Sequence, residues 1–524
     1  MSVTVRAVTP ETAEPAPTAR AESCTVIIFG ATGDLTRRKL IPALYDLRCV
    51  GVLSSRCEVI GTGRTPLSED EFRVRMREAA GVSQDEKVGN DARWRDFEER
   101  LHYLTGDPGD PGFYPALASE LEARRQDGAS PNTLFYIATP ASLARPIIEG
   151  LGAAGLARNS HGWSRVVLEK PFGRDLQSAR ELNRVVNDVY PEEAVFRIDH
   201  YLGKETVQNL LVFRFGNSIF EPVWNRNYVE YVEITAAEEL GVEHRAAFYE
   251  ETGALRDVVA NHLLQLLTLT AMEPPAAFDA DAVRDQKVQV LRAIQPMTVE
   301  EVARRAVRGQ YGPGTVDGTP VPGYREEPGV SRTSAVETFA AIEFHVDNWR
   351  WAGVPFYLRT GKRLGRKMTE IRVHFRRTPQ ALFASTPEAR AEPNLITLRI
   401  QPGEGIVITF AAKQPGSEMQ PLPVEAEFAY AKSFSSELPD AYATLLLDAM
   451  RGDGTLFTRR DEVEAAWRIV TPIEEAWAQL PLPSFPNYAA GSDGPRETLA
   501  LMRGRPHHCW CPIVPKARPR SLGS

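Results

Sequence analysis

The chain has 524 residues, more than one hydrophobic core normally holds, so at least two domains are expected. Its net charge of −8 and the lack of a long basic block argue against a nucleic-acid-binding surface. No apolar run approaches the roughly 20 residues of a membrane-spanning helix, and five cysteines fit a reducing cytoplasm better than a disulfide framework. We therefore predict a cytoplasmic protein that binds neither nucleic acid nor a membrane.

The N-terminal stretch, residues 1–20, is rich in Pro, Thr and Ala and has no apolar centre, so it does not read as a secretory signal. This composition indicates a disordered tail. Changes in the residue pattern divide the rest of the chain. We predict a disordered tail over residues 1–22, a dinucleotide-binding domain over 23–199, a second domain over 200–504 and an irregular, basic tail over 505–524.

A glycine-rich turn lies between a predicted strand at residues 26–29 and a predicted helix at residues 36–47. Strand, turn and helix in this order direct backbone N–H groups toward a pyrophosphate. The turn lacks the middle glycine of the GxGxxG pattern, so an ordinary tight turn is the alternative. The residues that would contact the dinucleotide are Gly30, Ala31, Thr32, Gly33, Asp34 and Leu35.

The next predicted strand, residues 57–60, leads into Gly61-Thr62-Gly63-Arg64. An NAD site usually has a carboxylate at this strand end, where it binds the ribose hydroxyl. Here no carboxylate is present, and Arg64 is placed to bind a 2′-phosphate. A solvated arginine is the alternative, but together with the glycine-rich turn Arg64 favours NADP.

Two further strands, residues 134–138 and 166–168, are separated by helical stretches, which predicts a parallel, doubly wound sheet. Ligands of such sheets bind beyond the carboxyl ends of the strands. Lys170 lies at such an end, and the proline after it restricts its placement. Further candidates to line the nicotinamide side are Asp107, Tyr136 and Pro140.

Residues 197–205 place an acid, an imidazole, a phenol and an amine in one short stretch with a glycine. These groups suit a site that holds an anionic substrate and orients a base. A charged surface loop is the alternative interpretation. The candidate residues of this stretch are Asp199, His200, Tyr201 and Lys204.

The second domain begins with mixed patterns. Apolar residues recur at three- and four-residue steps over residues 254–271, which predicts an amphipathic helix carrying Asp257 and His262. A lone histidine on such a helix is more often a core residue than a catalytic one. Several later segments alternate with period two and predict a large, mostly antiparallel sheet with helices on one face: residues 228–235, 337–346, 356–359, 370–375, 395–401 and 406–410.

The predicted fold class is therefore an α/β Rossmann-like coenzyme domain plus an α+β domain with a large, mostly antiparallel sheet. A basic stretch at residues 359–367 contains five cations, Lys362 and Lys367 among them. It is either a solvated loop or a phosphate or carboxylate site. Residues 312–329 are rich in Pro and Gly and predict a long loop. Cys509 and Cys511 lack a usual zinc spacing, so no metal site is predicted.

Several motifs together resemble the glucose-6-phosphate dehydrogenase family over about residues 25–495. The stretch 197–205 is the most specific of them. The others are the glycine-rich turn at 30–35, Glu169-Lys170-Pro171-Phe172-Gly173, Gly253-Ala254-Leu255-Arg256-Asp257, Asn261-His262-Leu263-Leu264-Gln265, and Asp347-Asn348-Trp349-Arg350-Trp351 leading to Gly361-Lys362.

The resemblance implies oxidation of D-glucose 6-phosphate at C1 to 6-phosphogluconolactone with formation of NADPH, the first step of the oxidative pentose phosphate pathway. It also implies a homodimer or homotetramer. By position, His262 would be the general base and Asp199 would hold its other ring nitrogen, with Lys170 between sugar and nicotinamide. His200, Tyr201 and Lys204, helped by Lys362 and Lys367, would bind the 6-phosphate, and Glu238 and Asp257 would bind sugar hydroxyls.

Some residues depart from the family pattern. Glu239 and Leu240 replace a common proline and aromatic residue, Asp493 stands where tryptophan is frequent, and Thr409 replaces a lysine that binds a second, structural NADP in some relatives, so that second site is not expected. Two alternatives remain: an enzyme for a non-phosphorylated sugar or for NAD, and a non-catalytic NADP-binding regulator. The presence of the phosphate-binding candidates argues against a non-phosphorylated sugar, and Arg64 argues against NAD. The presence of both Asp199 and His262 argues against a non-catalytic regulator.

Overall fold

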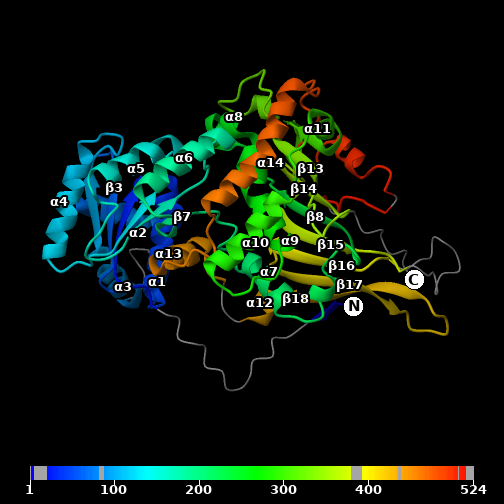
Figure 1. Ribbon diagram of the computed structural model, residues 1–524, viewed down its shortest axis with the longest axis horizontal. Helices are drawn as coiled ribbons and strands as arrows, with labels where there is room; N and C mark the ends of the chain where they lie inside the picture. Colours follow the sequence, from blue (N-terminus) through cyan, green and yellow to red (C-terminus); the bar gives the residue numbers. More distant parts are fainter. Residues whose placement is uncertain are drawn as a thin grey trace.

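Two sheets organise the chain into two parts that lie side by side (Figure 1). The computed structural model describes residues 2–4, 20–81, 88–378, 392–434, 438–505 and 507–514. A six-stranded sheet forms the part drawn in blue and cyan, and a nine-stranded sheet forms the other. Helix α14 (Arg460–Gln479) runs from one part toward the far end of the other.

The smaller sheet is entirely parallel, with strand order β4-β3-β2-β5-β6-β7. Its central strand β2 is buried at every position, which explains the continuous apolar run in the sequence. The four predicted strands are confirmed, whereas the short β7 and the half-buried β4 were not predicted. The bounds are β2 (Thr25–Phe29), β3 (Glu58–Gly63), β4 (Leu101–Thr105), β5 (Thr133–Ile137), β6 (Ser164–Leu168) and β7 (Val195–Arg197).

Helices cover both faces of this sheet, and each face has its own apolar core. The helix predicted over 36–47 begins with one wide π-helical turn, Thr36–Leu40, and continues as α1 (Ile41–Cys49). Ser68 caps α2 through a capping box with Glu71. The other helices are α2 (Glu69–Ala79), α3 (Val88–Glu98), α4 (Phe113–Gln126), α5 (Ala144–Ala153) and α6 (Leu176–Val189).

A helix from late in the chain completes the core of this first part. Helix α13 (Ala441–Arg451) packs against α1 and places Leu445 and Leu446 in the same apolar cluster as Leu44. The ring of Phe457 meets that of Phe196 with centroids 4.9 Å apart. Residues 441–458 thus pack with the coenzyme domain, although they lie within the stretch 200–504 that the sequence assigns to the second domain.

The larger sheet has the order β1-β18-β17-β16-β15-β8-β14-β13-β9. Its neighbours are antiparallel except for the pairs β1–β18 and β8–β14. All six predicted strands are confirmed, and β1, β9 and β18 are additional. The bounds are β1 (Ser2–Thr4), β8 (Val229–Ala237), β9 (Ala306–Gly309), β13 (Phe339–His345), β14 (Pro355–Gly361), β15 (Met368–Phe375), β16 (Leu395–Gln401), β17 (Gly405–Lys413) and β18 (Pro421–Ala429).

Helices pack against one face of this sheet and form the largest apolar core of the protein. They are drawn in green and orange in Figure 1. In addition to α14 they are α7 (Glu205–Phe215), the π-helical segment η6 (Leu255–Leu263), α9 (Leu264–Ala271), α10 (Ala280–Arg292) and α11 (Val299–Arg305). Helix α8 (Ala246–Ala254) precedes η6, and the single turn α12 (Tyr430–Ser433) follows β18.

Irregular segments cover the centre of the opposite face. Trp510 and Ile513, close to the C-terminus, are buried there with Tyr231 and Tyr357 of the sheet. The Asp493 carboxylate accepts hydrogen bonds from the backbone of residues 513 and 514. The described part of the predicted irregular tail is therefore packed against the sheet.

Two stretches differ from their predictions. The predicted loop at 312–329 contains a hairpin of β11 (Gly314–Val316) and β12 (Thr319–Val321), and β10 (Tyr311–Gly312) pairs with β19 (Tyr488–Ala489). In the predicted N-terminal tail, Ala21 is buried, and residues 2–4 form β1; residues 5–19 lie outside the described residues. Among the described residues, no helix is long and apolar enough to cross a bilayer.

Candidate active site

A kink between α8 and η6 sets the start of the helix that carries His262. Gly253 has φ 61° and ψ −178°, a conformation that is essentially restricted to glycine. The Glu337 carboxylate accepts a hydrogen bond from the Leu255 N–H at 3.0 Å and so caps the new helix. A Cβ on Gly253 would lie 2.3 Å from the same carboxylate oxygen. The following segment is wound as a π-helix, a geometry that often occurs at functional sites.

His262 and Asp199, which are 63 positions apart, form a buried pair: His262 Nδ1 lies 2.5 Å from Asp199 Oδ1. Asp199 follows strand β7, and the same oxygen accepts the Tyr201 N–H at 3.0 Å. The exposed fractions of His262 and Asp199 are 4% and 2%. Because Nδ1 is engaged, Nε2 is the ring nitrogen that remains for a substrate.

The imidazole of His262 and the carboxylate of Asp199 differ in charge at neutral pH. Burial lowers the pKa of His262 more than Asp199 raises it, so the imidazole is neutral near pH 7. Burial raises the pKa of Asp199, but the charge and hydrogen bond of His262 outweigh this effect and the net pKa is lowered. An ionised carboxylate therefore lies against a neutral imidazole, which is the arrangement of a histidine base.

Neighbouring rings fix the plane of the His262 imidazole. The Tyr201 ring stacks on it with centroids 4.3 Å apart and an interplanar angle of 16°. His200 meets it edge-on at 4.6 Å. Burial, and after it the charge of His262, lower the pKa of His200 well below its usual range.

A cavity of about 370 Å³ lies in front of His262. Its volume falls within the range of small-molecule sites. Ligand-facing groups come from both parts of the chain: Lys170 belongs to the loop after β6, His200 and Tyr201 belong to the turn after β7, and the rest come from the second sheet with its helices and loops. The polar residues that line it are Lys170, His200, Tyr201, Glu238, Glu239, Arg245, Asp257, His262, Lys367, Thr369 and Gln401.

Cationic and polar groups gather at the Tyr201 end of the cavity. Lys204 Nζ lies 4.9 Å from the Tyr201 ring centroid and is hydrogen-bonded to the Gln401 side chain. The Tyr201 hydroxyl pairs with Thr369 Oγ1 at 3.3 Å. Burial, and after it the charge of Lys367, lower the pKa of Lys204 to about 8. Cations and hydroxyl donors in this arrangement suit a phosphate.

Carboxylates mark the other end of the cavity. Lys170 Nζ donates to the backbone carbonyl of Asp257 at 2.7 Å and to its carboxylate at 3.1 Å. Burial raises the pKa of Asp257, but Lys170 and then Lys362 outweigh it and bring the pKa to about 2. Lys362 Nζ also bonds Glu238 at 2.7 Å. Ionised carboxylates at this end are suited to hydrogen-bond hydroxyl groups.

The structure thus brings together nearly all of the predicted substrate residues, but it separates the two lysines of the basic stretch. Lys367 lies near Lys204, whereas Lys362 is paired with Glu238 among the carboxylates. Sequence reasoning missed Arg245, Thr369 and Gln401. Thr369 lies on strand β15, two residues after Lys367, and residues two apart on a strand face the same side. This spacing could have indicated Thr369, whereas no sequence pattern indicates Arg245 or Gln401.

The glycine-rich turn follows β2, where the sheet order reverses between β3 and β5. Such a switch point is the expected place for a dinucleotide. Gly30 has φ +87°, and a Cβ there would lie 2.8 Å from the Ala138 carbonyl oxygen. Gly33 N–H donates to the Gly30 carbonyl at 2.9 Å, so the turn is tight, and the described geometry fits a pyrophosphate. Of the other turn residues, Ala31 is buried, Thr32 and Leu35 are half-buried and Asp34 is exposed.

The remaining coenzyme candidates lie at neighbouring strand ends. Arg64 directly follows β3 and is exposed, and Pro140 is also exposed. Asp107 accepts the Gly109 N–H at 2.9 Å and shapes the loop after β4. Tyr136 is fully buried, and its hydroxyl donates to Glu169 at 2.5 Å. Its surroundings make Tyr136 a support for Glu169 rather than an open contact surface.

Two groups of potential metal ligands occur among the described residues. One is the dyad itself with His200. In the other, Glu233 lies near His374 and Cys511, but it also accepts hydrogen bonds from the Arg359 guanidinium and the Cys511 backbone N–H. Because a buried guanidinium already neutralises this carboxylate, the geometry gives no support to a metal there.

Comparison with known proteins identifies the chain's relatives. The family model "Glucose-6-phosphate dehydrogenase, NAD binding domain" matches residues 27–209, and "Glucose-6-phosphate dehydrogenase, C-terminal domain" matches residues 211–511. The chain belongs to the glucose-6-phosphate dehydrogenase family. Relatives with the name glucose-6-phosphate 1-dehydrogenase include one from Chlamydia pneumoniae, 45% identical, with 94% of this chain and 96% of the relative covered. Another, from Treponema pallidum, is 46% identical, with coverages of 92% and 95%.

Solved glucose-6-phosphate dehydrogenases share the fold. One, described as in complex with its substrate glucose-6-phosphate, is 34% identical and has a TM-score of 0.84, with 95% of this chain and 100% of that chain covered. A second, from Mycobacterium avium, is 37% identical with a TM-score of 0.78 and the same coverages. The predicted fold class, with a Rossmann-like domain and a mostly antiparallel second sheet, is confirmed, as is a dinucleotide-binding domain for a nicotinamide coenzyme.

Proposed function

We propose that this protein oxidises D-glucose 6-phosphate at C1 to 6-phospho-D-glucono-1,5-lactone and transfers the hydride to NADP⁺. Membership of the glucose-6-phosphate dehydrogenase family supports the reaction. The observation that carries the proposal is the buried contact of 2.5 Å between His262 and Asp199 beside a cavity with cations at one end and carboxylates at the other.

His262 acts as the general base. Oxidation of an alcohol carbon releases a hydride and a proton, so a base must take the hydroxyl proton as the hydride leaves. The neutral imidazole accepts this proton at Nε2, and the Asp199 carboxylate stabilises the imidazolium that forms. In a serine-protease triad the same orienting contact is worth about 10⁴-fold in rate. When bound, the nicotinamide ring accepts the hydride.

The two ends of the cavity orient the substrate. His200, Tyr201, Lys204 and Lys367 bind the 6-phosphate at the cationic end. Asp257 and Glu238 hydrogen-bond sugar hydroxyls at the other end, and Lys362 is assigned there because it pairs with Glu238 at 2.7 Å. A sugar held at both ends directs its C1 hydroxyl toward one side of the cavity only.

The choice of NADP over NAD rests on Arg64. The glycine-rich turn at residues 30–35 holds the pyrophosphate through backbone N–H groups. The exposed Arg64 after β3 binds the 2′-phosphate, in a place where an NAD site usually has a carboxylate. Lys170, bonded to Asp257, lies between the sugar and the nicotinamide.

Two further properties are proposed with this function. A cytoplasmic location is supported by the cysteines: Cys24 and Cys57 are buried with sulfurs 3.9 Å apart and are both free thiols. Assembly into a homodimer or homotetramer is supported by apolar side chains exposed on two neighbouring strands of the large sheet, Phe410 on β17 and Leu422 on β18.

The direct test is an assay of purified protein for reduced nicotinamide with four combinations: glucose 6-phosphate or free glucose, each with NADP⁺ or NAD⁺. The expected result is rapid reduction with glucose 6-phosphate and NADP⁺, and loss of the activity in His262→Asn. Equal rates with free glucose would refute the phosphate site, and equal efficiency with NAD⁺ would refute the role of Arg64.

A further inference from the structure

Only one of the two carboxylate oxygens of Asp199 takes part in the contact with His262. Asp199 Oδ1 accepts from both His262 and the Tyr201 N–H. Its other oxygen, Oδ2, is buried and has no hydrogen-bond partner among the described residues. A buried carboxylate oxygen without a partner is costly, so the surroundings of Oδ2 require an explanation.

A second, smaller cavity also borders Asp199, and Lys170 lines both cavities. Its volume is about 30 Å³, and Asp199, Gln265 and Glu462 are among the residues that line it. This volume has room for about two water molecules, since one needs roughly 10–15 Å³. Gln265 is 3% exposed and its Oε1 also has no partner among the described residues. Asp199 and Gln265, each with a buried oxygen that lacks a partner, thus line the same small chamber.

Glu462 contributes an unusual buried charge to this chamber. It is 0% exposed and forms an ion pair at 2.8 Å with Lys287 of α10, whose side chain is 1% exposed. A buried ion pair of this kind adds little net stability compared with apolar side chains of the same size. Glu462 also accepts the Arg459 N–H at 3.4 Å at the start of α14, which accounts for the carboxylate but not for the buried lysine paired with it.

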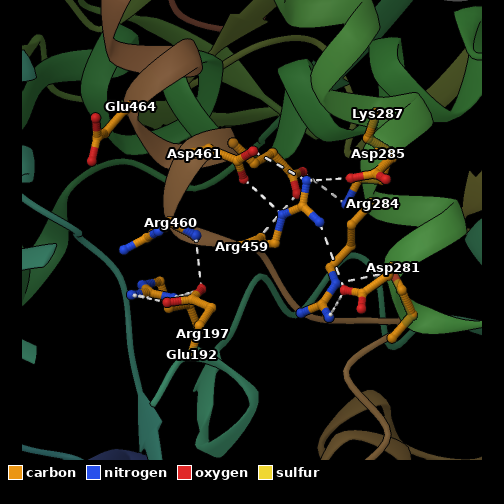
Figure 2. Close-up of polar contacts among 12 residues, drawn as sticks. Glu192, Arg197, Asp281, Arg284, Asp285, Lys287, Arg459, Arg460, Asp461 and Glu464 are labelled. Atoms are coloured by element: carbon orange, nitrogen blue, oxygen red, sulfur yellow. Dashed lines mark hydrogen bonds and ion pairs between the residues drawn. The ribbon is translucent and has the colours of Figure 1, made fainter. Parts of the chain in front are cut away.

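The segment that carries Glu462 also contacts strand β7, which directly precedes Asp199. Thr458 N–H donates to the Arg197 carbonyl at 3.0 Å, and Arg460 N–H donates to Glu192 at 2.9 Å. The Arg197 guanidinium binds the same Glu192 carboxylate at 2.6 Å (Figure 2). Figure 2 also shows Arg459, in the same segment, contacting Asp285 of α10. The start of α14 is thus fixed to β7 on one side and to α10 on the other.

We propose that Gln265 and the Lys287–Glu462 pair are positioning residues of the Asp199–His262 dyad, which act on Asp199 Oδ2 across this chamber through ordered water. This inference rests on the proposed function of the dyad and extends it. In this arrangement the water gives Oδ2 the donor that the described side chains do not supply. Lys287 neutralises Glu462, so that no second free negative charge lies beside Asp199.

Replacing one member of the Lys287–Glu462 pair at a time changes the charge beside Asp199 in opposite directions. In Lys287→Met the unpaired Glu462 carboxylate favours the imidazolium and raises the pKa of His262. In Glu462→Gln the unpaired Lys287 ammonium lowers that pKa. One unit charge acting through partly screened protein corresponds to a shift of roughly half a unit to one unit. Both substitutions leave the other charged and titratable groups in place. His200, Tyr201, Lys170 and Asp257 face His262, and Glu169 and Tyr442 face Asp199. Arg256, which is paired with Glu474, also lines the chamber.

The experiment measures the His262 pKa by NMR of the full-length protein with ring-labelled histidine, assigned with His262→Asn, together with the pH profile of kcat/KM. The expected result is opposite shifts in the two single variants and a return toward the wild-type value in Lys287→Met/Glu462→Gln. Glu464→Gln is the matched control, because it removes a carboxylate of α14 outside the chamber and leaves the pKa unchanged.

Gln265→Leu tests the water-mediated part. It keeps the side chain's approximate size, and we expect kcat to fall about 10-fold to 100-fold while the glucose 6-phosphate KM stays within a few-fold. Shifts of the same sign in both charge variants, no shift in either, or a Gln265→Leu enzyme with wild-type kcat would overturn the inference. If wild-type protein lacks the dehydrogenase activity, the proposed function fails, while the NMR titration still decides the charge coupling.

Discussion

Lys170 and Asp257 join the two parts of the protein at the substrate cavity. The Lys170 ammonium, in the loop after the last long strand of the coenzyme domain, donates to the Asp257 carbonyl at 2.7 Å and to its carboxylate at 3.1 Å. Asp257 belongs to the same helical segment as His262. One ammonium group therefore fixes the base-carrying segment relative to the coenzyme domain.

Replacing Lys170 with methionine should affect both binding and chemistry. Loss of a hydrogen bond to a charged group costs about 1.5–3 kcal/mol, so kcat/KM should fall by roughly 10-fold to 100-fold. The pKa of Asp257, which Lys170 helps to bring to about 2, should rise toward its ordinary value. Steady-state kinetics check the first effect. Lys170→Arg retains the charge and should lose less, and an inactive arginine variant beside an active methionine variant would contradict this role.

Asp199→Asn should lower kcat by about 10⁴-fold with the KM for glucose 6-phosphate within a few-fold, because the amide no longer stabilises the imidazolium. Single-turnover kinetics separate the chemical step from product release. A large change in KM with preserved kcat would show that Asp199 binds substrate instead. Asp188→Asn, an exposed aspartate at the end of α6, is a control that should retain full activity.

Lys204 should set the alkaline limb of kcat/KM. Its pKa of about 8 means that the ammonium is charged below this pH and loses its proton as the pH rises through it. Phosphate attraction is then lost, so kcat/KM should fall above pH 8. Lys204→Arg, which stays charged, should remove this limb, and Lys204→Ala should be weak at every pH. An unchanged alkaline limb in both variants would assign it to another group.

Arg64→Ser should raise the KM for NADP⁺ by about 10-fold or more and leave that for NAD⁺ nearly unchanged, since only NADP carries the 2′-phosphate. Kinetics with both coenzymes at saturating sugar phosphate measure the ratio. Arg56→Ser, an exposed arginine before the opposite end of β3, should change neither value. Equal losses with both coenzymes would point to a general structural role.

Gly253→Ala should destabilise the protein by about 1–3 kcal/mol and lower kcat, because the backbone conformation excludes a side chain and the new Cβ would meet Glu337. Thermal unfolding measures the first effect. Gly51→Ala is the matched comparison: its φ is +77°, but nothing lies within 4 Å of the added Cβ. If both variants lose equal stability, backbone strain alone explains the effect and the contact with Glu337 does not.

Periodic patterns made the strands predictable, because the sheet buries alternate side chains, and the central strand β2 buries all of them. Apolar steps predicted the helix over 254–271, but they do not distinguish the π-helical winding of η6 from an ordinary α-helix, nor do they indicate the backbone kink at Gly253. The contact between Asp199 and His262 was inferred from a family resemblance, since a separation of 63 positions in the sequence contains no distance information. The pairing of Lys362 with Glu238 was missed because a cluster of cations in sequence suggests one shared ligand, whereas the turn separates them.

Helix α13 has a consequence for how the protein is made. The six parallel strands all lie within the first 197 residues, yet their apolar covering includes side chains from residues 442–450. When those strands have emerged from the ribosome, the residues that cover them have not yet been synthesised. The nucleotide-binding half therefore cannot reach its final packing during translation of the N-terminal half, and it closes only after nearly the whole polypeptide has emerged.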